Sequence, residues 1–271
     1  MNGIVKNLPD ADYRNAPGYG STAIKWFLEE VPAQAKHWID HPEDAPTFDA
    51  ASVGQLVHAL VLGQPHPFVV KDWDGRTKEG KERAAEVAAN GQIGLSQSDF
   101  DLAHGMADGV RRHPTVAAIL DKPGSAECSV FATVDGVKCK ARFDWLPDDP
   151  NLPALDLKTA MSANPRVFVK NVAKFEYAVQ RAEYLDVLEA VEGRRRELLI
   201  VAVDKRAPHL TSLVGVPEMW SQIASDKAAK ARRIIRECEA SGVWPDYGDG
   251  IHYIDAPTYY VFDADEQEIE V

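Results

Sequence analysis

Two aspartates and one lysine near the middle of the chain are of the types that can hold a divalent metal beside a phosphate. Asp144 ends a strand-like segment, 137–145, whereas Asp156 and Lys158 lie in a second one, 154–159. Magnesium prefers oxygen ligands, often one or two carboxylates completed by water and substrate phosphate. A lysine at the same phosphate can orient an attacking water or offset developing negative charge. The residue types therefore indicate phosphoryl-transfer chemistry, although D-x-K alone occurs often by chance.

The segment between these two strands has strong turn chemistry. Residues 147–153 read Pro-Asp-Asp-Pro-Asn-Leu-Pro, which predicts a β-hairpin with the flanking segments. Side chains alternate along a strand, so Asp156 and Lys158 share one face and Leu157 points to the other. Asp144 can then meet Asp156 and Lys158 across the hairpin.

One predicted helix before the hairpin and one after it carry polar side chains that could reach the same site. His58 lies in the apolar helix predicted for residues 50–62, either as a core side chain or as a metal ligand presented to the strands. Gln180 and Tyr184 are spaced i, i+4 and share one face of a later helix. That pair is either ordinary helix polarity or a support for the same site.

The remaining pattern predicts a single α/β domain with an N-terminal helical elaboration. Ser21 is a plausible N-cap, Pro32 either breaks or restarts the helix that follows Ser21, and residues 40–49 form a loop. We expect helices over 21–31, 50–62, 78–90, 98–120, 164–191 and 217–241, and strands over 68–71, 197–203 and 210–216, with a strand-rich region over 128–156. The expected domain, 1–271, has a helical part (about 1–120), a catalytic core (about 121–243) and an acidic C-terminal tail (about 244–271).

Composition sets the class of protein. The chain has 271 residues, 45% hydrophobic and 27% charged, as expected for a globular protein. Neither an apolar run long enough for a membrane helix nor a signal peptide is evident, so no membrane association is expected. Three cysteines without C-x-x-C spacing disfavour a disulfide framework or a four-cysteine zinc site. A reducing cytoplasm is the simplest location.

Charge is distributed unevenly along the sequence. The net charge of −12 argues against a broad nucleic-acid-binding surface. However, residues 138–236 contain 18 Lys and Arg against 13 Asp and Glu, whereas residues 237–271 contain 10 acidic residues and no Lys or Arg. Basic charge therefore surrounds the candidate site, and a phosphate-binding field needs only such a local cluster.

Taken together, these residues resemble the PD-(D/E)xK nuclease superfamily, in particular its RecB-like and exonuclease VIII (RecE)-like phage branch. The match runs in order over about 130 residues and includes Gly54 to His58, Glu127, Gly136 with Arg142-Phe143-Asp144, Leu155 to Thr159, and Gln180 with Tyr184. The segment Ser-Thr-Ala-Ile-Lys at 21–25, followed by Pro32, also resembles the opening of exonuclease VIII-type proteins. The leading "PD" of the motif is not adjacent to D-x-K in this chain, because Asp144 precedes Asp156 by twelve residues. RecB-like hairpins permit such a separation.

The resemblance implies a mixed central β-sheet flanked by helices, as in restriction endonucleases, with the metal site at one edge. It implies that His58, Asp144, Asp156 and the Leu157 carbonyl bind Mg²⁺, for which Mn²⁺ can substitute. Lys158 would be the catalytic lysine. Gln180 and Tyr184 would support the site or touch DNA. Glu127 would contact the metal directly or through water, or be only a charged residue at a strand start. Relatives with an iron–sulfur cluster need four cysteines, so no cluster is expected.

The function implied is that of a Mg²⁺-dependent exodeoxyribonuclease. It would degrade linear double-stranded DNA from its ends, 5′ to 3′, and leave single-stranded tails for an annealing protein in phage-type recombination. A ring-shaped homo-oligomer is implied by the processive relatives. Basic residues near the site would hold the DNA backbone without reading sequence: Arg76, Lys78, Lys81, Arg111, Arg112, Lys138, Lys140, Arg142, Lys170 and Lys174.

Two other functions remain open at this point. One is a non-catalytic DNA-binding or assembly module with a decayed nuclease site, which the net charge of −12 favours slightly. The other is an endonuclease or a single-strand-specific nuclease of the same superfamily.

Overall fold

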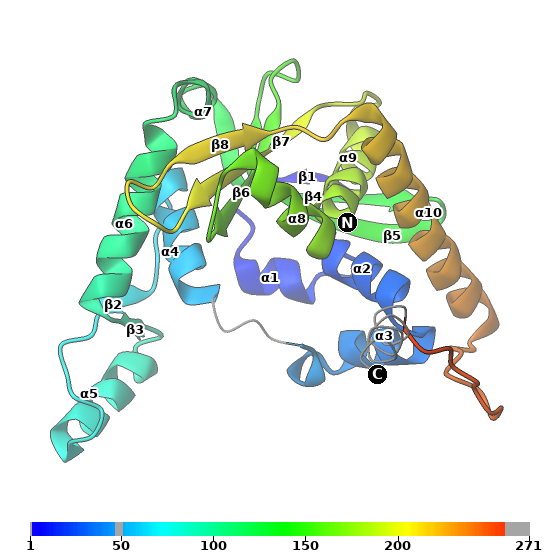
Figure 1. Cartoon of the computed structure of the whole chain (residues 1–271), viewed down its shortest axis with the longest axis horizontal. Helices are drawn as coiled ribbons and strands as arrows, with labels where there is room; N and C mark the ends of the chain where they lie inside the picture. The colour runs from blue at the N-terminus through cyan, green and yellow to red at the C-terminus, as the bar shows by residue number, and fades with distance from the viewer. Residues whose placement is uncertain (1, 47–50, 258–271) are drawn as a thin grey trace, which may run out of the picture.

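A mixed six-stranded sheet forms the centre of the protein in a computed structural model, which describes residues 2–46 and 51–257 (Figure 1). Its order is β1-β4-β5-β6-β7-β8, and every neighbouring pair is antiparallel except the parallel pair β6–β7. The strands are β1 (Gly3–Val5), β4 (Gly124–Val134), β5 (Val137–Pro147), β6 (Ala154–Ala160), β7 (Leu198–Asp204) and β8 (Thr211–Val214). The predicted fold class, a mixed sheet flanked by helices, is confirmed.

The parallel pair lies in the interior of the sheet because a helical crossover covers it. Between β6 and β7 the chain forms α8 (Pro165–Lys174) and α9 (Tyr177–Glu192). Parallel strands need such a connection, and they are usually covered on both faces. Strand β7 is accordingly almost entirely apolar, and only Leu199 is incompletely buried.

Helices cover both faces of the sheet and create two separate cores. One core packs the sheet against α2 (Ser21–Glu29), α3 (Pro32–Asp40), α8, α9 and α10 (Glu218–Ser241), and includes Phe143 and Phe168. The other packs it against α4 (Ala51–Leu62), α6 (Gln97–Arg111) and α7 (Pro114–Leu120), and includes Leu56 and Leu157. Burial of apolar area on both faces is the main stabilising contribution.

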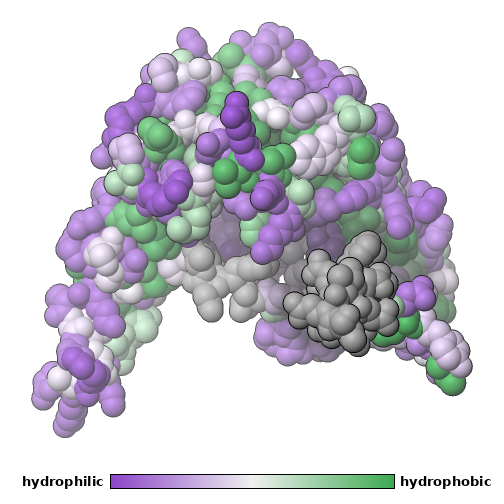
Figure 2. Space-filling view, in the orientation of Figure 1, coloured by the Kyte–Doolittle hydropathy of each residue, from purple (hydrophilic) through white to green (hydrophobic). Residues whose placement is uncertain are grey.

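Two limbs extend from the same side of the sheet. In Figure 1 one limb continues from α4 and α6 through a parallel strand pair, β2 (Phe68–Val70) and β3 (Ile93–Leu95), to α5 (Lys78–Ala89). The opposite limb contains α3 and the C-terminal part of α10. Figure 2 shows that the molecular surface is hollowed between the limbs. Short helix α1 (Asp10–Asn15) lies between them, and a 3-10 turn, η1 (Pro42–Asp44), follows α3.

Several boundaries differ from the sequence prediction. The helix expected over 98–120 is two helices, since His113 caps a new helix that starts at Pro114. The helix expected over 164–191 is also two, because Glu176 adopts a left-handed conformation with φ of 49°. Gly20 is the N-cap of α2, so Ser21 is its first helical residue and not the cap.

Some elements lay beyond the sequence prediction. Strands β1 and β3 and helix α1 were not predicted, because three to six residues carry too little periodicity. Of the predicted loop and tail, residues 47–49 and 258–271 lie outside the described residues, and 243–257 form neither helix nor strand. Among the described helices none combines the length and apolarity needed to cross a membrane.

A buried charge network joins the helical layer to the sheet. Arg232 of α10 donates to Asp186 of α9 at 2.9 Å, to Asp135 in the β4–β5 turn at 2.9 Å, and to the buried Glu183 of α9. Because Glu183 is inaccessible to solvent, its charge depends on this guanidinium. Burial raises the pKa of Glu183, although the charge of Arg232 opposes the shift.

We expect Arg232→Ala to lower the free energy of unfolding by about 3–5 kcal/mol, since it leaves the buried carboxylate of Glu183 without its counter-charge. The matched control is Arg233→Ala, which removes an exposed arginine from the next position of α10 and is expected to change stability by less than about 0.5 kcal/mol. Urea unfolding of both variants measures the difference. Equal stability of the two variants would show that the network is not needed for the fold.

Candidate active site

Three carboxylates lie side by side across β4, β5 and β6. The β4–β5 register places Glu127 opposite Asp144, and the single β5–β6 pair, Trp145 with Leu155, leads to Asp144 opposite Asp156. The ladder has no pair at Glu127, whose φ is 47°. Directly opposed side chains on neighbouring strands are in contact range. The antiparallel register therefore concentrates negative charge at one place on the sheet.

Asp144 is fixed by a side-chain bond at the place where β5 and β6 separate. Its Oδ2 accepts a hydrogen bond from the backbone N–H of Leu157 at 2.5 Å. A carboxylate thus takes the position that a backbone carbonyl would occupy in a continued ladder. Asp144 is only 8% exposed, so this charge-assisted bond lies in a region of low dielectric.

Helix α4 brings His58 onto the same carboxylate. His58 Nδ1 is 3.5 Å from Asp144 Oδ1, and Nε2 is 3.1 Å from the carbonyl oxygen of Leu157. The donor atoms of His58, Glu127 and Asp144 all lie within 4.8 Å of one another. One imidazole and two carboxylates at this separation could hold a divalent metal.

Three of the five expected metal ligands form a group that could hold an ion, and the metal-binding role of all five stays a prediction. His58 and Asp144 are brought together as expected, and Glu127 joins them. Asp156 is not part of this group, and its two oxygens pair with Lys158 and Gln180. The Leu157 carbonyl, an expected metal ligand, accepts from His58 instead.

Asp156 belongs to a second, adjoining cluster. Lys158 Nζ is 2.7 Å from Asp156 Oδ2, and Gln180 Nε2 donates to Asp156 Oδ1 at 2.9 Å. The expected common face of Asp156 and Lys158 is thus present, with α9 providing Gln180. Tyr184, one turn further along α9, packs its ring on Phe143 with 5.2 Å between centroids. The i, i+4 pair therefore faces the site, Gln180 by a hydrogen bond and Tyr184 by packing.

Burial and neighbouring charges shift the pKa values of the three carboxyls in different directions. Burial, followed by the charge of Asp144, raises the pKa of Glu127 to about 7. Burial also raises the pKa of Asp156, more than the ammonium of Lys158 lowers it. For Asp144, burial is outweighed by the combined effects of His58, the Lys158 ammonium and the Leu157 N–H, and the pKa falls below its usual value. Asp144 is therefore the carboxyl that most readily carries a full negative charge.

Four of the ten basic residues expected at DNA donate hydrogen bonds to backbone carbonyls elsewhere in the fold, although Arg111 and Arg112 are themselves exposed. Arg142 is 9% exposed and donates to Ser129, Asp10 and the Leu8 carbonyl. The other three donate to backbone carbonyls: Lys140 to those of Tyr13, Arg14 and Ala16, Arg111 to those of Leu60 and Val61, and Arg112 to that of Pro208. These contacts hold the N-terminal segment, the C-terminal end of α4 and the loop between β7 and β8, and Arg142 is buried by them.

The other six expected DNA contacts are exposed. Arg76, Lys78 and Lys81 belong to the α5 limb, where Asp74 pairs with Arg76 at 2.8 Å and Glu82 with Lys78 at 3.9 Å. Lys138 is on β5, and Lys170 and Lys174 are on α8. Their contact with DNA stays a prediction.

Sequence reasoning missed two residues beside Lys158. The Nζ of Lys158 lies 5.0 Å from the ring centroid of Tyr177, at the start of α9. Lys25 of α2 donates from Nζ to the carbonyl of Phe175 at 3.3 Å, two residues before that tyrosine. The sequence signal that could have pointed to Lys25 is its place in the segment 21–25, which carries part of the family resemblance.

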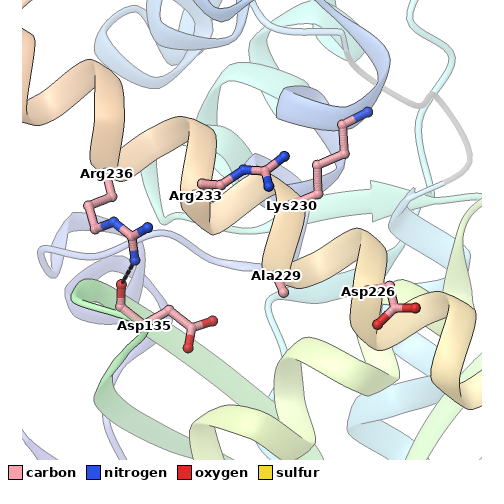
Figure 3. A pocket seen from close by; sticks show the side chains of 6 residues that line it. All are labelled: Asp135, Asp226, Ala229, Lys230, Arg233 and Arg236. Atoms are coloured by element: carbon pink, nitrogen blue, oxygen red, sulfur yellow. Dashed lines mark hydrogen bonds between the residues drawn. The ribbon is translucent and has the colours of Figure 1, made fainter.

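A separate surface groove follows α10 and is lined by mixed charges (Figure 3). Lys230, Arg233 and Arg236 share it with Asp226 and Asp135, and Arg236 donates to the Asp135 carbonyl at 2.9 Å. Asp135 is nine residues from Asp144 along the β4–β5 hairpin, about 30 Å at the rise of a strand. This groove is therefore distinct from the carboxylate cluster.

Comparison with solved structures supports the fold independently. A crystal structure from Eubacterium rectale, provisionally described as an exonuclease, is 15% identical, with a TM-score of 0.64 over 96% of this chain and 99% of that one. A second structure, described as SSO0001, is 16% identical over 79% of this chain and 84% of that one, but its TM-score of 0.29 carries no argument. The search of curated proteins finds no match.

The family assignment comes from the sequence itself. A family model described as "PDDEXK-like domain of unknown function (DUF3799)" matches residues 20–257. This range begins at the N-cap of α2 and contains all the carboxylates, the histidine and the lysines described above. The chain therefore belongs to the PDDEXK-like domain family.

Proposed function

We propose that this protein is a metal-dependent nuclease that hydrolyses phosphodiester bonds in DNA. The observation that carries the proposal is the pairing of two adjoining clusters in a PDDEXK-like domain. The first, His58, Glu127 and Asp144, offers ligands to a divalent metal. The second, Asp156 with Lys158 and Gln180, places an ammonium and a further carboxylate next to it.

The residues have distinct roles in this proposal. A bound Mg²⁺ or Mn²⁺ would polarise a phosphoryl oxygen and lower the pKa of a bound water. Asp144 is the central ligand, with His58 and Glu127 beside it. Asp156 and the Leu157 carbonyl would complete the set by turning from their present partners to the metal. Lys158 orients the water or offsets negative charge on the phosphate, while Gln180 holds Asp156 in position. Tyr184 supports α9 against β5 by packing on Phe143.

The finer activity is proposed from the family resemblance. We infer an exonuclease that acts on ends of linear double-stranded DNA, 5′ to 3′, in the bacterial cytoplasm, and leaves single strands for an annealing protein. A ring-shaped homo-oligomer would confine DNA, with exposed lysines such as Lys170 and Lys174 on its path. Sedimentation equilibrium measures whether the particle contains several chains.

We expect Asp156→Ala to reduce DNA hydrolysis about a thousandfold, and Lys158→Ala about a hundredfold or more, because each removes a preorganised charge from the reacting phosphate. The assay is release of acid-soluble nucleotides from linear duplex DNA with Mg²⁺. Asp121→Ala, an exposed aspartate at the end of α7, is the control and is expected to retain activity. Hydrolysis that survives both substitutions would exclude this cluster as the catalytic site.

Metal binding separates the nuclease from a decayed module that keeps only the fold. We expect Mn²⁺ to bind the wild-type protein in calorimetry, and Asp144→Asn to abolish the heat of binding. Glu127→Gln is expected to weaken Mn²⁺ affinity at least about tenfold. Loss of a residue that only hydrogen-bonds to a metal ligand already weakens metal affinity by about that much. Glu43→Gln, an exposed carboxylate in η1, is the control. Failure of the wild type to bind Mn²⁺ would favour the decayed module.

End dependence separates an exonuclease from an endonuclease of the same superfamily. We expect linear duplex labelled at the 5′ end to lose its label early, duplex labelled at the 3′ end to lose it late, and closed circular duplex to stay intact. Nicking of the circles would indicate an endonuclease. Preference for a single-stranded substrate would indicate a single-strand-specific enzyme, and early loss of the 3′ label would reverse the proposed direction.

A further inference from the structure

Two lysines from different elements flank the short turn that joins α8 to α9. Lys158 of β6 lies over the ring of Tyr177, with its Nζ 5.0 Å from the centroid. Lys25 of α2 donates to the carbonyl of Phe175 at 3.3 Å. The turn from Phe175 to Tyr177 is thus in contact with both ammonium groups, one of which belongs to the cluster around Asp156.

The two lysines differ in how their charge is compensated. Lys158 has Asp156 at 2.7 Å. Lys25 forms no ion pair with a carboxylate among the described residues, 2–46 and 51–257. It donates a hydrogen bond to the carbonyl of Phe175. Burial, and after it the positive charge of Lys158, lowers the pKa of Lys25. A partly buried ammonium without a counter-ion is stabilised by an anion that enters beside it.

The turn itself is held in an unusual conformation. Glu176, at the centre of the turn, has a φ of 49°, which is in the left-handed region and unfavourable for residues other than glycine. Lys227 of α10 pairs with the Glu176 carboxylate at 2.5 Å, so that carboxylate is directed to α10. Strained backbone that neighbouring elements fix in place is concentrated at functional sites.

We propose that Lys25 binds a non-bridging phosphate oxygen of the DNA strand beside the phosphate that Lys158 contacts. This inference rests on the proposed nuclease function and adds a binding residue to it. The geometry favours a phosphate because Lys25 retains ammonium hydrogens beyond the one given to Phe175, and because the lysine at the other end of the turn lies in the candidate active site. Helix α2 would then position the strand, and the turn would set the spacing of the two lysines.

The test measures DNA affinity as a function of salt, which reports phosphate contacts directly. A fluorescent blunt duplex is titrated with wild type and Lys25→Gln in Ca²⁺, and hydrolysis is measured separately in Mg²⁺. We expect Lys25→Gln to bind more weakly and to reduce the slope of log affinity against log salt concentration by about 0.9, the value for one lost contact. Lys25→Arg is expected to retain the slope. Lys122→Gln, an exposed lysine after α7, is the control and is expected to keep the wild-type slope.

The outcomes separate this inference from the proposed function. Lys25→Gln that melts at a lower temperature but keeps the wild-type slope would show a purely structural bond to Phe175 and overturn the assignment. A wild type that does not hydrolyse DNA would remove the proposed nuclease function, while the salt slope would still show whether Lys25 touches a phosphate. A reduced slope for Lys25→Gln and an unchanged one for Lys25→Arg support the assignment.

Discussion

The bond from the Leu157 N–H to the Asp144 carboxylate determines the geometry of the whole candidate site. It occupies a position that a β-ladder would fill with a backbone carbonyl, so β5 and β6 pair only at Trp145 and Leu155 before they separate. Separation of the strands gives His58 access to both Asp144 and the Leu157 carbonyl. The same strand β6 carries Asp156 and Lys158, whose side chains pair with each other beside this group.

Concentrated negative charge is the cost of this arrangement. Three carboxyls on adjacent strands repel one another, and burial adds to the penalty on their charged forms. The raised pKa of Glu127, about 7, and the raised pKa of Asp156 express this cost, while His58 and Lys158 offset part of it. A divalent cation would relieve the remaining repulsion. The helices therefore support a local electrostatic arrangement that the sheet alone would not tolerate.

The rest of the fold supplies rigidity to that arrangement. Two cores, one on each face of the sheet, fix α4 and α9 at the distances their side chains require. Arg232 ties α10 to α9 through the buried Glu183 and the half-buried Asp186, and Lys227 ties α10 to the turn before α9. Basic residues contribute to the same end, since Lys140 and Arg142 anchor the N-terminal segment. Much of the basic charge in the sequence is thus structural.

The sequence by itself indicated an α/β domain and the hairpin, because alternation and turn chemistry are local properties, and its family resemblance supplied the mixed sheet and the order of the site residues. His58, Asp144, Asp156, Lys158 and Gln180 were all found that way. Only the tertiary structure decided that Glu127 lies with His58 and Asp144 while Asp156 pairs with Lys158, since this depends on strand register. It also buried Arg142 and brought Lys25 to the turn before α9, because contacts between residues more than a hundred positions apart leave no local signal.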